Sequence, residues 1–227
     1  MENTFRKRPH YYVIEKLYTE LTIRMLPALA RTRLTPNQVT LANYANGFLI
    51  MFLITTQRFM PAALLIQVYL FLDIVDGNLA RYTGKTTRLG QILDHIGDRF
   101  FYNVVMIVLG LATPVHWGWI AAFLLIHNTY AAATTYYIVP AIRRIAEFRR
   151  FGLKKILMDR GLLLGMDLST QALIISVLIA TPWRGQILPS VTALYLADLL
   201  FRLFELARNR HFLSDRNASN RRGGSGK

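Results

Sequence analysis

Residues 60–80, MPAALLIQVYLFLDIVDGNLA, decide the fold: they are apolar apart from one glutamine until two aspartates, Asp73 and Asp76, interrupt the run. The stretch has the roughly 20 residues that an α-helix needs to cross about 30 Å of hydrocarbon. An ionisable side chain at membrane depth is costly and marks a functional site by default. The stretch therefore predicts a membrane-spanning helix with a functional site toward its end.

Five more stretches of similar length and composition lie along the chain. They cover residues 38–57, 89–112, 115–140, 162–182 and 187–207. Hydrophobic residues make up 53% of the 227, more than in an ordinary soluble domain. A water-soluble helical bundle, the alternative, needs long polar faces that these stretches lack. The sequence predicts an all-α integral membrane protein with six transmembrane helices.

The formal net charge of +14 is distributed unevenly around these stretches. Of the 27 lysines and arginines, 23 lie in the N-terminal arm, after the second and fourth stretches, or in the tail; only Arg58 and Arg184 lie in the opposite connections. Positively charged loops stay in the cytoplasm, so we expect both termini there. A nucleic-acid binder of this charge rarely holds so many large apolar residues. We therefore expect membrane lipids, and no nucleic acid, as partners.

The N-terminal arm has a pattern of its own. Segment 11–31 places apolar residues on one helical face and basic residues on another, which is typical of a helix lying on the membrane surface. The apolar face consists of Ile14, Leu17, Tyr18, Leu21 and Met25. Pro27 is expected to bend or end this helix. The sequence thus predicts a cytoplasmic arm with an amphipathic interfacial helix (1–33), a six-helix transmembrane domain (34–208) and a polar, disordered tail (209–227).

Four aspartates fall within 26 residues of the chain. Asp73 and Asp76 are three residues apart, and Asp94 and Asp98 are four apart. Each pair therefore projects from one face of its helix. The short basic segment 82–88 joins the two helices into an antiparallel hairpin, in which we expect the pairs to face each other near the cytoplasmic ends.

Four carboxylates gathered at low dielectric repel one another unless protons or cations neutralise them. The chain has no cysteine, and His95 is turned about 100° around the helix from its neighbour Asp94. The expected ligands are therefore oxygens, and this donor set favours Mg²⁺, Mn²⁺ or Ca²⁺ over zinc. A site that keeps positions open for phosphate oxygens suits Mg²⁺ or Mn²⁺, as a pair of ions. The cluster therefore predicts a divalent-metal site that opens to the cytoplasm.

Small residues continue both aspartate stripes, and basic residues stand at their cytoplasmic end. The small residues are Gly77, Ala80 and Gly90, and the basic residues are Arg81, Lys85 and Arg88. A carboxylate face that continues in small residues indicates a pocket, and cations at its mouth suit phosphate. Polar contacts between helices, or the cation pathway of a divalent-cation transporter, are alternatives that do not need these small residues in register. A basic scaffold on the membrane surface needs no buried acids.

The pattern D73-x-x-D76-G77-x-x-A80-R81-x8-G90-x3-D94-x3-D98 resembles the full signature of the class I CDP-alcohol phosphotransferases, also called CDP-alcohol phosphatidyltransferases. These are integral membrane enzymes of phospholipid biosynthesis and are typically homodimers. By this resemblance, Asp98 shares in metal ligation and acts as general base. The other implied metal ligands are Asp73, Asp76 and Asp94, and the implied binders of the CDP moiety are Gly77, Ala80, Arg81 and Gly90. The residues by themselves do not identify cytidine.

The resemblance implies that an alcohol hydroxyl attacks the β-phosphorus of a CDP-linked substrate and that CMP leaves. Two versions remain open. In the favoured one, CDP-diacylglycerol donates its phosphatidyl group to a small soluble alcohol. In the other, a soluble CDP-alcohol of the choline or ethanolamine type donates to a lipid hydroxyl. We expect the lipid and the soluble substrate to reach the site by different routes, from the side and from the cytoplasm.

The acceptor pocket is less well marked by the sequence. Candidate residues for a phosphorylated acceptor are Arg143, Arg144, Arg160 and Arg202, with Asn37 as an accessory residue near the site. The first three also fit the positive-inside pattern. Arg202 follows Asp198 by four residues, so the two side chains either neutralise each other or shape the pocket. Thr35 and Pro36, just before Asn37, also read as an ordinary helix start.

Overall fold

The computed structural model describes residues 11–86, 88–145, 148 and 150–209, and within them all side chains except those of Leu89, residues 91–96 and Asp98. The described chain is helical apart from one short pair of strands and the connections. The elements are β1 (Tyr11–Tyr12), α1 (Val13–Arg31), α2 (Pro36–Thr55), α3 (Phe59–Thr83), α4 (Arg88–Ala112), α5 (Gly118–Ala132), the π-helix η1 (Ala133–Ile138), α6 (Val139–Arg144), α7 (Gly152–Asp159), β2 (Leu162–Leu163), α8 (Leu168–Ile179), the 3-10 helix η2 (Pro182–Gln186) and α9 (Ile187–Asn209). The tail and the first ten residues, to which part of the arm prediction refers, lie outside the described residues.

Each of the six predicted stretches overlaps a helix, so the all-α prediction is confirmed. In the described part of the chain, three helical segments are long and apolar enough to cross a membrane: Pro36–Thr55, Phe59–Thr83 and Pro182–Asn209. The apolar helices Arg99–Ala112 and Leu168–Ile179 are shorter. The number of six spans therefore stays a prediction. Large apolar side chains are exposed along the long helices, as expected for surfaces that meet lipid.

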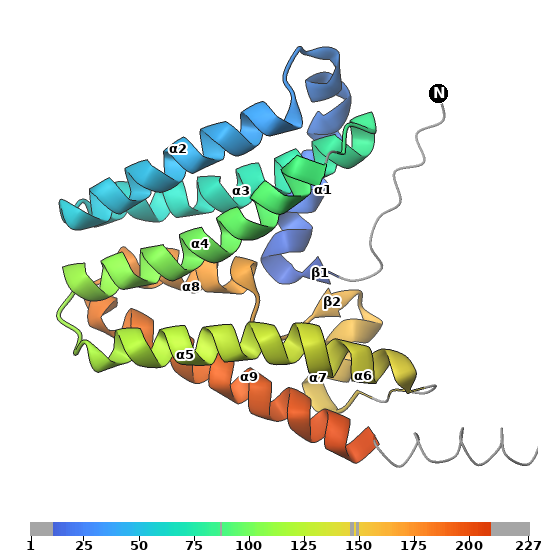
Figure 1. Cartoon of the computed structure of the whole chain (residues 1–227), viewed down its shortest axis with the longest axis vertical. Helices are drawn as coiled ribbons and strands as arrows, with labels where there is room; N and C mark the ends of the chain where they lie inside the picture. Colours follow the sequence, from blue (N-terminus) through green and yellow to red (C-terminus); the bar gives the residue numbers. More distant parts are fainter. Residues whose placement is uncertain (1–10, 87, 146–147, 149, 210–227) are drawn as a thin grey trace, which may run out of the picture.

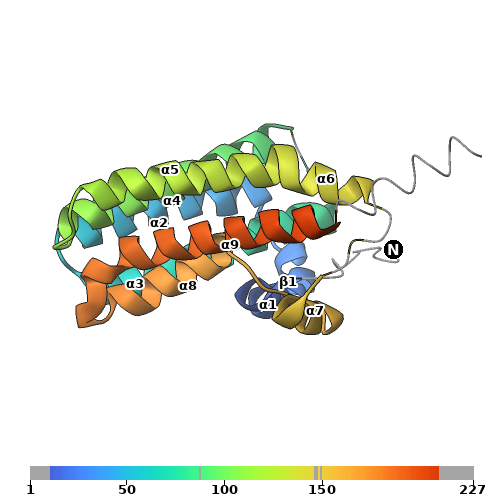
Figure 2. The same ribbon diagram turned by 90° about the horizontal axis from the view of Figure 1, so that it is seen from below.

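The long helices form two groups, and within each group the helices lie side by side along their length (Figures 1 and 2). One group contains α2, α3 and α4, and the other contains α5, α8 and α9. They meet mainly where α3 packs against α8, over a core whose largest buried side chains include Tyr69, Tyr102, Tyr195 and Phe123. Helix α1 crosses α3 at a steep angle, at the end of the bundle where α7 and the two strands also lie (Figure 1).

Local sequence explains several helix boundaries. Thr35 caps α2 as predicted: its hydroxyl accepts the Gln38 N–H at 3.3 Å, and the Gln38 amide oxygen accepts the Thr35 N–H at 2.9 Å. Helix α1 does not end at Pro27 but continues through it to Arg31, so of the two expected effects of this proline only a bend stays a prediction. The predicted stretch 115–140 is one continuous helical path, but it widens into η1 just before Pro140, whose ring cannot fit an unperturbed α-helix.

The two strands connect distant parts of the chain. Tyr11 and Tyr12 pair in parallel with Leu162 and Leu163, and the Tyr11 N–H donates to the Gly161 carbonyl at 3.3 Å. The start of α1 is thereby tied to the segment that precedes α8. The face of α1 predicted to be wholly interfacial is divided, since Tyr18 packs on the core and donates to Gln67 Oε1 at 2.8 Å.

Candidate functional site

The first candidate site lies where α2, the end of α3 and the start of α4 come together. Gly84 ends α3 in the left-handed conformation, with φ of 67°, which glycine adopts without strain. A cavity of about 240 Å³ lies beside this turn. It is lined by Pro36, Asn37, Thr40, Asp76, Gly77, Ala80, Arg81, Lys85, Thr86 and Gly90. Five residues of the predicted signature and the accessory Asn37 thus line one cavity, which we call the signature cavity.

Asp76 is the buried acid of this cavity, with 6% of its surface exposed. The Thr40 hydroxyl of α2 donates to Asp76 Oδ2 at 2.6 Å, which fixes the direction of the carboxylate. Sequence reasoning missed Thr40, because a single threonine in an apolar helix usually bonds to its own backbone. The one available signal was its place one helical turn after Asn37.

Arg81 stands at the mouth of the cavity and is exposed. A side chain on Gly77 would begin 3.5 Å from the Arg81 guanidinium, so the guanidinium lies across the bare backbone of α3. Arg81 also donates to Asn78 Oδ1 at 3.1 Å. Together with the exposed Lys85, it gives the cavity a positive mouth, while the Asp76 carboxylate and the small residues lie inside. This arrangement suits a phosphate bridged to a cation.

The predicted metal ligands are only partly described. Asp73 is half-buried on α3, one turn before Asp76, and does not line the signature cavity. The side chains of Asp94 and Asp98 lie outside the described ones, so their predicted roles stay predictions. Among the described side chains, no group of three or more histidines, cysteines or acids gathers around one point. The described donors are carboxylate oxygens, and this chemistry fits a hard divalent cation.

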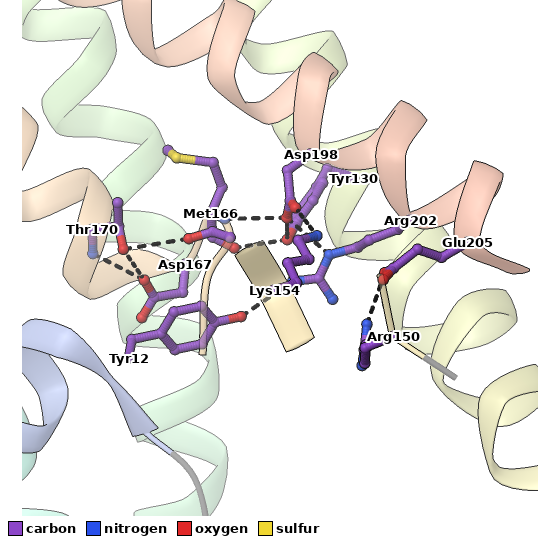
Figure 3. Close-up of polar contacts among 11 residues, drawn as sticks. Tyr12, Tyr130, Arg150, Lys154, Met166, Asp167, Thr170, Asp198, Arg202 and Glu205 are labelled. Atoms are coloured by element: carbon purple, nitrogen blue, oxygen red, sulfur yellow. Dashed lines mark hydrogen bonds and ion pairs between the residues drawn. The ribbon is translucent and has the colours of Figure 1, made fainter. Parts of the chain in front are cut away.

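A second polar cluster joins α5, α7 and α9 (Figure 3). At its centre, Asp198 is ion-paired with Lys154 at 2.7 Å and with Arg202 at 2.8 Å. Asp198 Oδ2 also accepts the Tyr130 hydroxyl at 2.7 Å and the Met166 N–H at 3.1 Å. The predicted pairing of Asp198 with Arg202 is confirmed, and Lys154 and Tyr130 are additions that the sequence did not indicate.

Arg202 also reaches the N-terminal arm. Its guanidinium donates to the Tyr12 hydroxyl at 3.1 Å, and burial raises the pKa of that phenol above its usual value, which keeps it neutral. A small polar cavity of about 110 Å³ lies here, lined in part by Tyr12, Arg150, Lys154 and Arg202. Arg150 pairs with Glu205 at 2.9 Å. The ion pairs of this cluster thus join three cations to the carboxylates of Asp198 and Glu205, and the Asp167 carboxylate lies nearby (Figure 3).

The other basic candidates are not part of this cluster, and the nearby Asp167 has a local structural role. Arg143, Arg144 and Arg160 are exposed and do not line the small polar cavity. Asp167 caps α8, since its carboxylate accepts the Ser169 N–H at 3.1 Å and the Thr170 N–H at 2.9 Å.

Comparisons with known proteins agree on one family. A family model described as CDP-alcohol phosphatidyltransferase matches residues 33–181. The archaetidylinositol phosphate synthase of Pyrococcus horikoshii is 32% identical over 107 residues, 47% of this chain and 56% of that protein. The bifunctional IPC transferase and DIPP synthase of Thermococcus kodakarensis is 30% identical over 149 residues, 59% of this chain and 34% of that protein. The phosphatidylinositol phosphate synthase of Cutibacterium acnes is 30% identical over 115 residues, 48% and 54% of the two chains. The matches thus cover a third to just over half of these relatives.

Proposed function

Because this chain belongs to the CDP-alcohol phosphatidyltransferase family, we propose that it transfers the phosphatidyl group of CDP-diacylglycerol to the hydroxyl of a small alcohol and releases CMP. The observation that carries the proposal is the signature cavity, in which a buried carboxylate, a floor of small residues and a positive mouth converge. These are the parts that binding of a diphosphate with a divalent cation requires.

Asp73, Asp76, Asp94 and Asp98 would hold the cofactor, Mg²⁺ or Mn²⁺, as two ions. Bound there, the ions would supply Lewis-acid stabilisation to the phosphate oxygens. The support is the oxygen-only donor set and the hydrogen bond by which Thr40 orients Asp76 toward the cavity. Orientation of a ligand by its neighbours is a usual requirement of metal sites.

The residues of the chain would bind the diphosphate and move one proton. Gly77, Ala80 and Gly90 leave room for the CDP moiety, and Arg81 binds its phosphate oxygens. Asp98 accepts the proton of the acceptor hydroxyl while the new O–P bond forms at the β-phosphorus. The bond from that phosphorus to CMP breaks, and the electron pair leaves with CMP. Because a carboxylate is a weak base, positioning must supply much of the rate.

We propose further that the acceptor carries a phosphate group. The names of the three relatives above include inositol phosphate products or an IPC transferase, and a fourth, from Aquifex aeolicus, is a glycerol-3-phosphate phosphatidyltransferase, 29% identical over 66 residues. The cluster around Arg202 supports this choice, because Arg150, Lys154 and Arg202 all line one small polar cavity. Arginine and lysine side chains are the usual partners of phosphate groups in proteins. Arg202, Lys154 and Arg150 are the proposed binders, in preference to the exposed Arg143, Arg144 and Arg160.

The proposed setting is a homodimer with six spans in each chain, with both termini and the site in the cytoplasm. The uneven distribution of positive charge supports this orientation. The exposed apolar stripe of α1, formed by Val13, Leu17, Leu21 and Met25, supports a position on the membrane surface.

The test is CMP release by the purified chain with Mg²⁺ or Mn²⁺ in lipid micelles. CDP-diacylglycerol is offered with glycerol 3-phosphate, inositol 1-phosphate, inositol, serine or choline, and CDP-choline with diacylglycerol is the reversed pairing. We expect release with a phosphorylated alcohol, and a loss of several orders of magnitude in Asp98→Asn. Asp159→Asn, an exposed aspartate on α7, is the matched control. Normal turnover in a folded Asp98→Asn variant would exclude the base role, and cation flux into vesicles without CMP release would favour a transporter.

A further inference from the structure

A groove of about 240 Å³ lies between α2 and α4, farther along both helices than the signature cavity. Its sides include Tyr44, Phe48 and Met51 of α2 and Phe100 of α4. At its base, the rings of Tyr69 and Phe101 stack at 3.7 Å with an interplanar angle of 11°. The lining is apolar except for the tyrosine hydroxyls, so the groove offers little to a polar ligand.

The groove continues the line of the signature cavity. On α2, Asn37 and Thr40 line the cavity, while Tyr44, Phe48 and Met51 line the groove. Successive members of this series are three or four residues apart, so all five lie on one face of the helix. On α4, Gly90 lines the cavity and Gly97 the groove, two helical turns apart. The polar cavity and the apolar groove are therefore successive sections of one seam between the same two helices.

Two glycines allow the aromatic walls of the groove to pack closely against the helix backbone. A Cβ atom on Gly97 would overlap the Tyr44 ring, and one on Gly47 would lie 3.2 Å from Phe101. The two aromatic rings thus pack directly against helix backbone, which leaves them little freedom to collapse into the groove. The groove is preformed.

The mouth of the groove opens at the outer surface of the helix bundle. Phe48 and Phe100 stand at its rim with 67% and 59% of their surfaces exposed, and α2 is long and apolar enough to span a membrane. At 1.5 Å per residue, Tyr44 lies about 10 Å and Met51 about 21 Å beyond Asn37 along the helix axis. Since half of the hydrocarbon core is about 15 Å thick, a groove over this interval lies in the deeper part of the leaflet and extends past the midplane when Asn37 is at the hydrocarbon boundary.

We propose that this groove binds one acyl chain of the CDP-linked lipid while the diphosphate of the same molecule occupies the signature cavity. This inference rests on the proposed function and adds the place where the acyl chain of the substrate lies. Continuity selects this groove over a larger apolar cavity of about 510 Å³ between α7, α8 and α9. Helices α2 and α4 line both the groove and the signature cavity, whereas neither of them lines that larger cavity.

The first test fills the deep end of the groove. Met51→Trp is compared with Leu49→Trp, which adds the same ring at an exposed position of α2 that does not line the groove. Each variant is assayed with dioctanoyl and dioleoyl CDP-diacylglycerol. In Met51→Trp, we expect the ratio of kcat/KM for the short over the long substrate to rise about tenfold, the effect of expelling about two methylene groups. An unchanged ratio would overturn the groove assignment.

The second test uses the unaltered chain and does not depend on turnover. CDP-diacylglycerol with a diazirine on one acyl chain is photolysed in the complex, and the labelled peptides are identified by mass spectrometry. Label in residues 44–51 or 97–101 supports the groove, whereas label confined to the segment around Phe151 or Phe201 overturns it.

A third test asks whether a second copy of the chain covers the groove. Because the chain has no cysteine, Phe48→Cys provides a single thiol. An oxidative crosslink between two copies would show that the groove is covered by a second chain and would also overturn the proposal. Absence of CMP release from either lipid by the unaltered chain would instead count against the proposed function.

Discussion

Asp198→Asn should lower the stability of the fold, because it removes the negative charge that two buried cations share. The side chains of Asp198, Lys154 and Arg202 are only 7%, 11% and 13% exposed. Removing one partner of a buried ion pair costs about 3–5 kcal/mol, since the remaining charge is left uncompensated. The asparagine carbonyl can still accept from Tyr130 and the Met166 N–H, so we expect the lower end of this range.

A loss of about 3 kcal/mol corresponds to a fall of about 6–12 °C in the melting temperature of a chain of this size. The measurement is thermal unfolding of the purified protein in detergent, followed by circular dichroism. Asp159→Asn, which changes an exposed aspartate on the same α7 helix as Lys154, should shift the midpoint by about 2 °C or less. Lys154→Met should lower the midpoint less than Asp198→Asn, because Asp198 keeps Arg202 as its ion-pair partner. A midpoint for Asp198→Asn within about 2 °C of the unaltered chain would refute the view that these cations depend on Asp198.

Three further outcomes follow from the site and the caps. Thr40→Val should lower kcat for CMP release about tenfold or more, because a hydrogen bond to a charged group contributes about 1.5–3 kcal/mol, while Thr40→Ser, which keeps the donor to Asp76, should retain most of the rate. EDTA should abolish CMP release and Mg²⁺ or Mn²⁺ should restore it; full activity in excess chelator would exclude the metal. Asp167→Ala should cost about 1 kcal/mol through loss of the α8 cap, seen as a melting temperature about 2–4 °C lower, whereas Asp167→Asn should lose less.

Regular patterns in the sequence were sufficient to predict the helices and part of the site. The apolar stretches predicted where helices lie. The small residues that continue the aspartate stripe of α3 predicted a pocket, and Gly77 and Ala80 do line a cavity together with Asp76, although Asp73 does not line it. The cap at Thr35 is equally local. These features depend on residues close together in the chain.

Contacts between distant segments could not be predicted in the same way. Lys154 pairs with Asp198 across 44 residues, and nothing in the local sequence distinguishes Lys154 from the neighbouring exposed Lys155. The uniform hydropathy of residues 115–140 concealed the π-helix, which is a backbone adjustment near Pro140. The local helical pattern assigned Tyr18 to the interfacial face. Its inward position could not be predicted, because it depends on a contact with Gln67 of α3.

The pairing of β1 with β2 has a consequence for the order in which the protein assembles during synthesis. Tyr12 lies beside Leu163, and Tyr12 also contacts Arg202 of α9. A ribosome adding about 5–20 residues per second needs about 8–30 s to travel from the first strand to the second. Until then, the start of α1 lacks its strand partner, although the α2–α4 group can already be in the membrane. The N-terminal arm is therefore among the first segments made and among the last to dock.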